Sequence, residues 1–277
     1  MSNKKTDNAI RNLFIEKIYN ICDGKKAEEV FLTYIKSDGT EEDITYRSFG
    51  LKCELLMQKF QKSMLRRNDR VLVLTPMSPF GCIAVTALAI SELVSVVLNP
   101  QLPEEELDSL VKKSDISGIV CDEEIYQKYA YKWTQKYPVL NIKTGDLFLD
   151  REYFSEPSKD SDDVLAILYS SGTTSEPKGV MITYEAQMKS AEFLLRAFGT
   201  NDIRYLLVFP MFHVSGFSVF FALFLGGGQI GLLENTNSIK LMDGFQKYKP
   251  NAFGMVPKVY ETFYTCLLYT SDAADEL

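Results

Sequence analysis

The sequence contains few of the residues that build metal centres or disulfide frameworks. A single histidine among 277 residues excludes a histidine-rich metal site. The cysteines are odd in number and are never spaced as C-x-x-C; they are Cys22, Cys53, Cys82, Cys121 and Cys266. No export signal precedes them, because the polar residues 1–7 lead into no apolar core of a signal peptide. We therefore interpret the first four cysteines as reduced thiols, mostly in the core, and expect a cytoplasmic location.

Runs of basic residues are also missing. No run of Lys and Arg exceeds two residues, and the net charge is −7. This balance argues against a nucleic-acid-binding surface. Apolar residues make up 46% of the chain and charged residues 24%, which is ordinary for a soluble protein with a sizeable core.

One long stretch without charge needs its own interpretation. Residues 205–233 carry no charged side chain and are numerous enough to span a bilayer. Pro210, His213, Gly216 and three glycines at 226–228 divide the stretch. The pieces suit a buried strand at 206–209, a loop at 211–216, a helix at 217–225 and a second strand at 230–233. We therefore expect no stable membrane span.

Short apolar runs alternate with amphipathic segments along the rest of the chain. Residues 30–35 and 43–46 flank a Ser-Asp-Gly-Thr turn, which predicts a hairpin. Beyond it we predict strands at 71–74, 95–98, 118–121, 139–142 and 165–169, and helices at 47–64, 80–93, 104–113 and 123–133. This alternation favours an α/β fold with layered, parallel-rich sheets covered by helices.

A polar stretch at residues 155–163 is the clearest boundary in the chain. We predict a polar N-terminal extension or first helix (1–26), a first α/β subdomain (27–154), a second α/β subdomain that carries a phosphate loop (155–265) and a C-terminal tail (266–277).

The segment 169–179 reads Tyr-Ser-Ser-Gly-Thr-Thr-Ser-Glu-Pro-Lys-Gly and follows a predicted buried strand. Small residues let backbone N–H groups converge on an anion, and hydroxyl groups add donors. It is not a P-loop, because Pro177 stands where the second glycine of G-x-x-x-x-G-K-[ST] must be. A solvated Ser/Thr-rich turn is the alternative, but it requires no such ordered run of hydroxyls. We predict that the segment binds nucleotide phosphates through Ser170, Ser171, Gly172, Thr173, Thr174 and the positively charged Lys178.

At these residues the chain resembles the adenylate-forming enzymes, which include acyl-CoA synthetases, luciferases and peptide-synthetase adenylation domains. Their loop reads roughly Y-T-S-G-T-T-G-x-P-K-G, and residues 169–179 match it except at Ser170 and Ser175. The run Phe-Pro-Met-Phe-His-Val-Ser-Gly at 209–216 is similar to the P-L-F-H-x-x-G block of acyl-CoA synthetases. The resemblance covers roughly residues 27–265. It implies the N-terminal region of the adenylate-forming synthetase fold, incomplete at its C-terminal end.

The resemblance implies a two-step ligase reaction in a full-length parent enzyme. ATP, with Mg²⁺, activates a carboxylic acid, expected to be a fatty acid, as acyl-AMP, and the acyl group then passes to CoA. Lys178 and His213 are the implied catalytic residues, and Phe212, His213 and Gly216 are implied to contact the acid. Amino-acid-activating relatives tend to carry an aspartate at the position of His213, so an α-amino acid substrate is disfavoured. The expected partners are therefore a small-molecule carboxylic acid, ATP and CoA.

Three local patterns have a structural interpretation as well. His213 has apolar neighbours and, taken alone, would suit a hydrogen-bonded core histidine. The aromatic stripe Phe217, Phe220, Phe221 and Phe224 has helical spacing and favours a helix buried in the core over the lining of an acyl pocket. Tyr184 stands where the family usually has a histidine, and we assign it no role.

The end of the chain departs from the family pattern. Residues 266–277 read like the translation of a transposase adapter used in sequencing libraries, which nucleotide sequencing would test. The family's magnesium-ligating glutamate and its adenylation lysine are expected beyond residue 265, so no metal ligand is identifiable and the chain alone is expected to be inactive. One alternative is an acyl-AMP ligase or peptide-synthetase adenylation domain that serves a carrier protein. Another is a naturally short, non-catalytic nucleotide-binding protein, which requires 266–277 to be genuine coding sequence.

Overall fold

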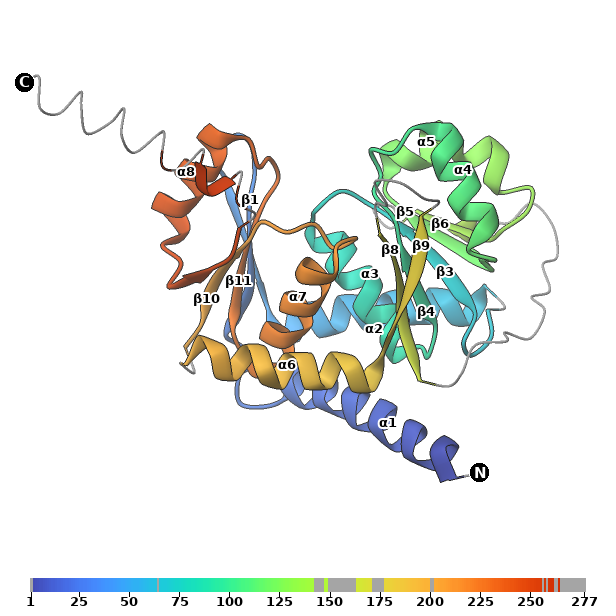
Figure 1. The fold of residues 1–277 in the computed structure, drawn as a ribbon, viewed down its shortest axis with the longest axis horizontal. Coiled ribbons are helices and arrows are strands. Elements are labelled where there is room, and N and C mark those ends of the chain that lie inside the picture. The colour runs from blue at the N-terminus through green and yellow to red at the C-terminus, as the bar shows by residue number, and fades with distance from the viewer. Residues whose placement is uncertain are drawn as a thin grey trace, which may run out of the picture.

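The computed structural model describes residues 2–63, 65–141, 147–148, 163–170, 177–199 and 202–255, together with 257, 259–261 and 264. These residues form two β-sheets with helices around and between them (Figure 1). The first sheet has the order β12-β10-β11-β1-β2 and comprises β1 (Val30–Ile35), β2 (Glu41–Thr45), β10 (Arg204–Leu207), β11 (Gln229–Leu233) and β12 (Ala252–Phe253).

The second sheet has the order β7-β6-β5-β3-β4-β8-β9. Its strands are β3 (Arg70–Leu74), β4 (Val94–Val97), β5 (Gly118–Cys121), β6 (Val139–Asn141), β7 (Leu147–Phe148), β8 (Val164–Ser170) and β9 (Lys178–Thr183). The five strands from β6 to β8 in this order are parallel, and the two outermost strands, β7 and β9, pair antiparallel with their neighbours. This confirms the α/β class with parallel-rich sheets.

Eight helices cover the sheets in the described part of the chain. They are α1 (Ser2–Asp23), α2 (Tyr46–Lys62), α3 (Pro79–Ile90), α4 (Glu104–Lys113), α5 (Glu123–Trp133), α6 (Tyr184–Phe198), α7 (Val214–Gly226) and α8 (Ser238–Tyr248). Helices α2, α3 and α7 lie between the sheets, α4 and α5 cover the far face of the second sheet, and α8 covers the far face of the first (Figure 1). The molecule therefore has five layers, α–β–α–β–α.

The residues of β3 show how one strand serves two of these layers. Val71 and Val73 pack in the central core, whereas Leu72 and Leu74 pack in the outer core with α4 and α5. Successive side chains of a strand point to opposite faces, so a strand buried on both sides is apolar throughout. This explains why the sequence shows a continuous apolar run here and no alternation.

An aromatic cluster fills the central layer. Phe31 of β1 has its ring centroid 4.8 Å from that of Phe224 of α7 and 4.9 Å from that of Phe49 of α2. Edge-to-face and tilted rings at this spacing contribute attraction beyond the area they bury. All four phenylalanines of α7 at positions 217, 220, 221 and 224 are fully buried in this core. The core interpretation of that stripe is thus confirmed.

Each sheet takes strands from both halves of the chain. The hairpin β1–β2 joins the first sheet through parallel pairing of Leu32 with Ile230. Conversely, β8 joins the second sheet through pairing of Val96 with Ile167. Sheet membership therefore crosses the polar stretch at residues 155–163, most of which lies outside the described residues.

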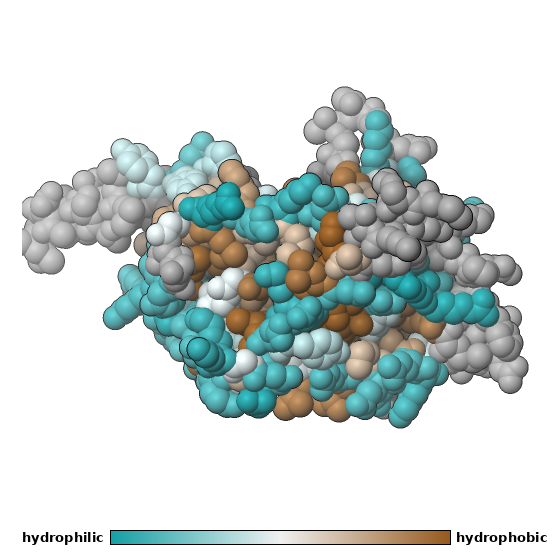
Figure 2. Space-filling view, turned by 90° about the horizontal axis from the view of Figure 1, so that it is seen from below, coloured by the Kyte–Doolittle hydropathy of each residue, from teal (hydrophilic) through white to brown (hydrophobic). Residues whose placement is uncertain are grey.

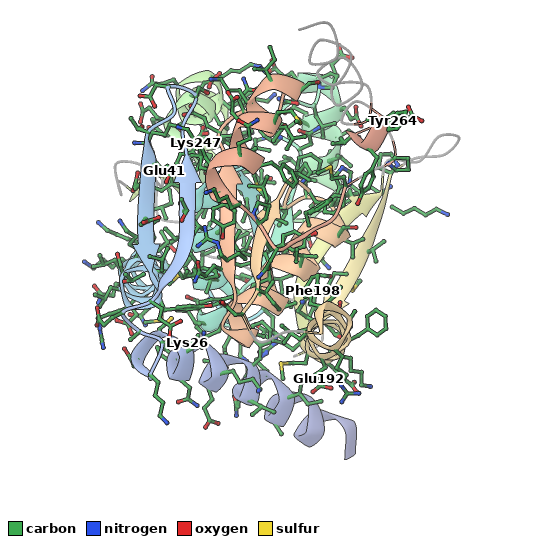
Figure 3. All side chains as sticks on the ribbon, turned by 90° about the vertical axis from the view of Figure 1, so that its left-hand side faces the viewer. Lys26, Glu41, Glu192, Phe198, Lys247 and Tyr264 are labelled. Carbon is green, nitrogen blue, oxygen red and sulfur yellow. The ribbon has the colours of Figure 1, made fainter. Side chains whose placement is uncertain are left out.

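Two lysines tie the first sheet to its surroundings at opposite ends (Figure 3). Lys26, before β1, donates from Nζ to the carbonyl oxygen of Gly227, 2.9 Å away, at the C-terminal end of α7. A cation at that position complements the partial negative charge of the helix end. At the other end, Nζ of Lys247 in α8 donates to the carbonyl oxygen of Gly39, 2.7 Å away, in the β1–β2 turn.

No helix among the described residues is long and apolar enough to cross a membrane. The uncharged stretch 205–233 is instead divided among β10, α7 and β11, and most of its apolar side chains are buried in the core. On the face seen from below, apolar and hydrophilic side chains are interspersed (Figure 2).

Candidate functional site

The predicted phosphate loop connects β8 to β9. These strands are antiparallel neighbours, with Tyr169 opposite Gly179 and Ser170 opposite Lys178. Lys178 is the first residue of β9 and its side chain is exposed at the base of the connection. Of the other predicted phosphate-binding residues, Ser170 ends β8, but its side chain lies outside the described part, as do Ser171, Gly172, Thr173 and Thr174. Their role stays a prediction.

The second predicted segment enters the same region from the first sheet. The chain leaves β10, turns at Pro210, and begins α7 at Val214. His213 is the N-cap residue of α7, with extended backbone (φ −99°), and its backbone N–H donates to the carbonyl oxygen of Pro210 at 3.0 Å. Its side chain makes no cap hydrogen bond, and its ring lies 4.7 Å from the ring of Phe212. His213 is exposed, so it is not the buried core histidine that its apolar neighbours suggest.

A cavity of about 280 Å³ brings the two segments together. Tyr169 and Pro177 line it from the two ends of the loop, and Phe212 and His213 line it from the start of α7. Its remaining walls come from the end of β4 and from α4; they are Val97, Leu98, Asn99, Leu102, Glu106 and Leu110. The structure therefore places a mostly apolar cavity between the predicted phosphate-binding and acid-binding segments.

A second cavity, of about 340 Å³, adjoins the first and shares Val97, Asn99 and Phe212 with it. It lies where β3, β4 and β5 end and where β11 ends. Among the described residues, its lining includes the carboxylates of Asp122, Glu124 and Glu234, and no Lys, Arg or His. Ligands of α/β proteins bind outside the carboxyl ends of the parallel strands, and both cavities occupy that position. This acidic lining does not suit phosphate groups.

Sequence reasoning missed the residues that follow β4 and those of α4. Asn99 lines both cavities, and Glu106 and Leu110 form a wall of the first. The only signal for them in the sequence is their place at or after the end of a parallel strand, where ligand-contacting residues gather.

Gly216 is required by packing. A Cβ atom at this position would lie 2.2 Å from the carbonyl oxygen of Pro210 and 2.5 Å from that of Phe209. Gly216 thus lets the first turn of α7 lie against the backbone of the preceding turn. Gly216 is buried and lines neither cavity. Its contribution is to allow this close packing of the turn that carries Phe212 and His213.

Tyr184 lies away from both cavities. It is the first residue of α6, it is buried, and its hydroxyl donates to the carbonyl oxygen of Ala89 at 3.0 Å. The guanidinium of Arg11 lies over its ring, 5.1 Å from the centroid. Burial raises the pKa of Tyr184 well above its usual range. Tyr184 therefore joins α1, α3 and α6 in the core.

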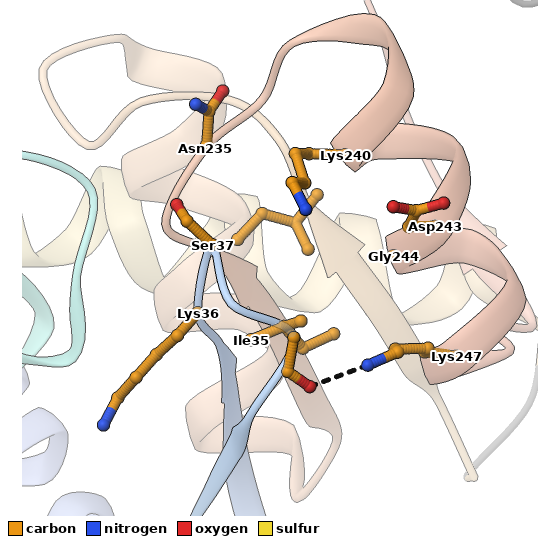
Figure 4. A pocket seen from close by; sticks show the side chains of 10 residues that line it. Ile35, Lys36, Ser37, Asn235, Lys240, Asp243, Gly244 and Lys247 are labelled. Atoms are coloured by element: carbon orange, nitrogen blue, oxygen red, sulfur yellow. Dashed lines mark hydrogen bonds between the residues drawn. The ribbon is translucent and has the colours of Figure 1, made fainter.

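A third hollow lies between the β1–β2 turn and α8 (Figure 4). It has about 40 Å³ of space, and three lysines line it, Lys36, Lys240 and Lys247. Lys247 is committed to the carbonyl oxygen of Gly39 (Figure 4). A hollow of this size holds only a few water molecules.

The described residues provide no group of three or more His, Cys, Asp or Glu side chains that could hold a metal ion.

The chain matches the family model described as AMP-binding enzyme over residues 22–275. It is 24% identical over 239 residues to 4-coumarate–CoA ligase 2 from Petroselinum crispum, an alignment that covers 79% of this chain and 43% of that protein. A long-chain-fatty-acid–CoA ligase from Archaeoglobus fulgidus has a similar structure, with a TM-score of 0.78 and 19% identity, over 92% of this chain and 54% of that one.

O-succinylbenzoate coenzyme A synthetase from Bacillus subtilis, in complex with ATP and magnesium ion, has a TM-score of 0.74 and 17% identity over 90% of this chain and 65% of that one. The chain spans less than two thirds of the length of each of these proteins, and the structural likenesses establish a shared fold. By its match to the family model over residues 22–275, the chain belongs to the AMP-binding enzyme family.

Proposed function

We propose that this chain is the N-terminal part of a ligase that uses ATP to activate a carboxylic acid and transfers the acyl group to CoA. The observation that carries the proposal is the first cavity, which Tyr169 and Pro177 of the loop line together with Phe212 and His213. Family membership supports the adenylation step. The relatives named above support a CoA acceptor.

In the first proposed step, a carboxylate oxygen attacks the α-phosphorus of ATP. A P–O bond forms, the bond to the β-phosphate bridge breaks, and pyrophosphate leaves with the negative charge. Lys178, with the donors of residues 170–174, would stabilise charge on the β- and γ-phosphates. Its exposed position at the start of β9 gives the ammonium access to a bound polyphosphate.

In the second step, the CoA thiolate attacks the acyl carbonyl and AMP leaves. His213 and Phe212 stand at the entrance from α7 and would orient the carboxylate between the loop and the cavity. We propose a fatty or other apolar acid as substrate, because most of the residues that line the cavity are apolar; they are Val97, Leu98, Leu102, Leu110, Pro177 and Phe212. Magnesium would bind with the phosphates of ATP, because the described residues offer no group of three or more His, Cys, Asp or Glu side chains for a metal ion.

The decisive experiment is ATP–pyrophosphate exchange by the complete gene product with a panel of fatty, aryl and amino acids. Exchange with apolar acids, followed by acyl-CoA formation on addition of CoA, is the expected result. Acyl transfer to a carrier protein and none to CoA would instead support the acyl-AMP ligase or peptide-synthetase alternative. Absence of exchange with every acid would reject adenylation.

We further propose that the 277-residue chain alone forms no acyl-CoA. Apolar side chains of its last described residues are exposed, Phe253 by 46% and Tyr260 by 48%, and invite association. Residues 266–277 lie outside the described part, and the family match ends within them at residue 275. Their adapter origin stays a prediction that the nucleotide sequence tests.

A further inference from the structure

The C-terminal end of α4 contacts both ends of the loop that connects β8 to β9. Lys113, the last residue of α4, donates from Nζ to the carbonyl oxygen of Pro177 at 2.9 Å. The next residue, Ser114, has its Oγ 2.9 Å from the hydroxyl oxygen of Tyr169. Tyr169 comes before the loop segment 171–176 and Pro177 follows it directly. Two consecutive residues of one helix end therefore hold the two ends of this connection.

The hydrogen-bond direction at Ser114 follows from its other contact. Its hydroxyl donates to the carbonyl oxygen of Leu110 at 2.6 Å, and a serine has only one hydroxyl hydrogen. Tyr169 must therefore be the donor to Ser114. Ser114 is buried, with 1% of its surface exposed, so water does not compete easily for this bond.

The ring of Tyr169 also packs against Gly179 of β9. A Cβ atom at Gly179 would lie 3.2 Å from Cζ of Tyr169 and 3.0 Å from Cγ2 of Ile167. The ring thus packs across the glycine of the neighbouring strand β9. Both the ring and the hydroxyl of Tyr169 have one defined position.

Helix α4, which makes these contacts, is itself anchored to the rest of the molecule on two faces. Leu107, Leu110 and Val111 are buried in the outer core against the second sheet. On the outside, Lys132 of α5 forms ion pairs with two carboxylates of α4, Glu104 and Asp108. The same helix lines the first cavity, so one helix supplies both a wall of the cavity and the contacts to the two ends of the loop.

From this geometry we propose that Lys113 and Ser114 are positioning residues for nucleotide binding. They hold Pro177 and Tyr169 at fixed places and thereby set the position of Lys178, which follows Pro177 directly. A preorganised site loses less conformational entropy when ATP binds. The proposal rests on the function proposed above and adds two residues of α4 to its nucleotide site.

The test compares two adjacent lysines in the complete gene product. Lys113→Gln removes the charged donor to Pro177, whereas Lys112→Gln changes an exposed lysine with no ion pair or hydrogen bond to the described residues. We expect Lys113→Gln to raise KM for ATP in the exchange assay by about threefold to tenfold, the range for one ordinary hydrogen bond, because this one is exposed to water. The rise should exceed any change in kcat. Lys112→Gln should match the wild type.

Two further variants separate positioning from simple stability. Lys113→Arg keeps a charged donor and should restore most of the affinity for ATP. Tyr169→Phe keeps the ring on Gly179 but removes the donor to Ser114, and should also raise KM for ATP. Thermal midpoints of all four variants should stay near that of the wild type.

The outcomes distinguish this proposal from the one on which it rests. An active wild type with equal KM values for the 112 and 113 variants would overturn the positioning role and leave the ligase function standing. Loss of activity in step with loss of thermal stability, without rescue by arginine, would assign Lys113 a structural role only. A wild type without exchange for any acid would overturn both proposals.

Discussion

Lys178 and Gly216, two of the predicted site residues, differ in what a substitution should change. Lys178 is exposed and contributes a charge that no core contact requires. Gly216 is buried and contributes the absence of a side chain, because backbone oxygens occupy the space a Cβ would need. Substitution of the first should affect chemistry, and substitution of the second should affect folding.

Lys178→Ala in the complete gene product should lower adenylation by about 10² to 10³, by analogy with the loss of one donor to developing charge. The urea midpoint should hardly change, because an exposed lysine adds little to the core. ATP–pyrophosphate exchange measures the first effect. A variant within about threefold of the wild-type rate would reject the role of Lys178.

Gly216→Ala should lower the free energy of unfolding by about 1–3 kcal/mol, since the new methyl group meets the carbonyl oxygens of Phe209 and Pro210. Ser215→Ala, one residue earlier and exposed, is the matched control and should stay within about 0.5 kcal/mol of the wild type. Urea denaturation of the 277-residue chain measures both. Equal stability of the two variants would show that α7 can move away from the carbonyl oxygens of Phe209 and Pro210 without cost, and would contradict the prediction.

At the level of elements, α1 is attached to the rest of the molecule through a buried arginine. Arg11 is fully buried, and its Nη2 donates to Oδ1 of Asn68 at 2.9 Å. Its Nε and Nη1 have no hydrogen-bond partner among the described residues. A buried charge with unpaired donors has a desolvation cost that its contacts do not fully offset.

Arg11→Met should therefore leave the free energy of unfolding within about 1 kcal/mol of the wild type or raise it. Asn68→Gly should lower it by about 1.5–3 kcal/mol, because the buried guanidinium then loses its acceptor. Glycine is the suitable replacement, since Asn68 has φ 66° and a larger residue would add strain. In the double variant the cost of Asn68→Gly should shrink, and additive costs would contradict this account.

At the scale of the whole molecule, the buried thiols should make the free energy of unfolding depend on pH in the alkaline range. Burial raises the pKa of Cys22 and Cys82 to about 12, and it raises the pKa of Cys53 and Cys121 as well. In the unfolded chain these thiols ionise near pH 8.5. The folded state then keeps protons that the unfolded state has lost. Their contribution to stability is full below pH 8.5 or so and decreases as the pH rises toward 12.

The urea midpoint should accordingly fall between pH 8 and pH 10. In a Cys266→Ser background, an aromatic disulfide reagent at pH 8 should label no thiol rapidly in the folded chain and all four in denaturant. Buried, protonated thiols are poor nucleophiles. Rapid labelling of any one of the four in the folded state would show that its neighbourhood opens.

Much of the local structure is set by the sequence alone. Helices 104–113 and 123–133 and strand 118–121 have the predicted bounds, and the hairpin of residues 30–45 forms as expected. These elements combine a hydrophobic period with nearby turn or start residues, which act within a few positions. The loop motif likewise predicts the family, because its residues are consecutive, and the match over residues 22–275 confirms it. The role of Lys178 stays a prediction.

The tertiary structure decides what depends on distant pairing. Nothing near residues 30–35 in the sequence indicates that β1 pairs with β11, some 200 positions later, and not with β3, the next strand after the hairpin. The same holds for α4, whose apolar face predicts burial but whose end meets Pro177 and Tyr169 only in the fold. Periodicity reports which face of an element is buried. Only the packed molecule determines which partner buries it, and therefore which residues share a site.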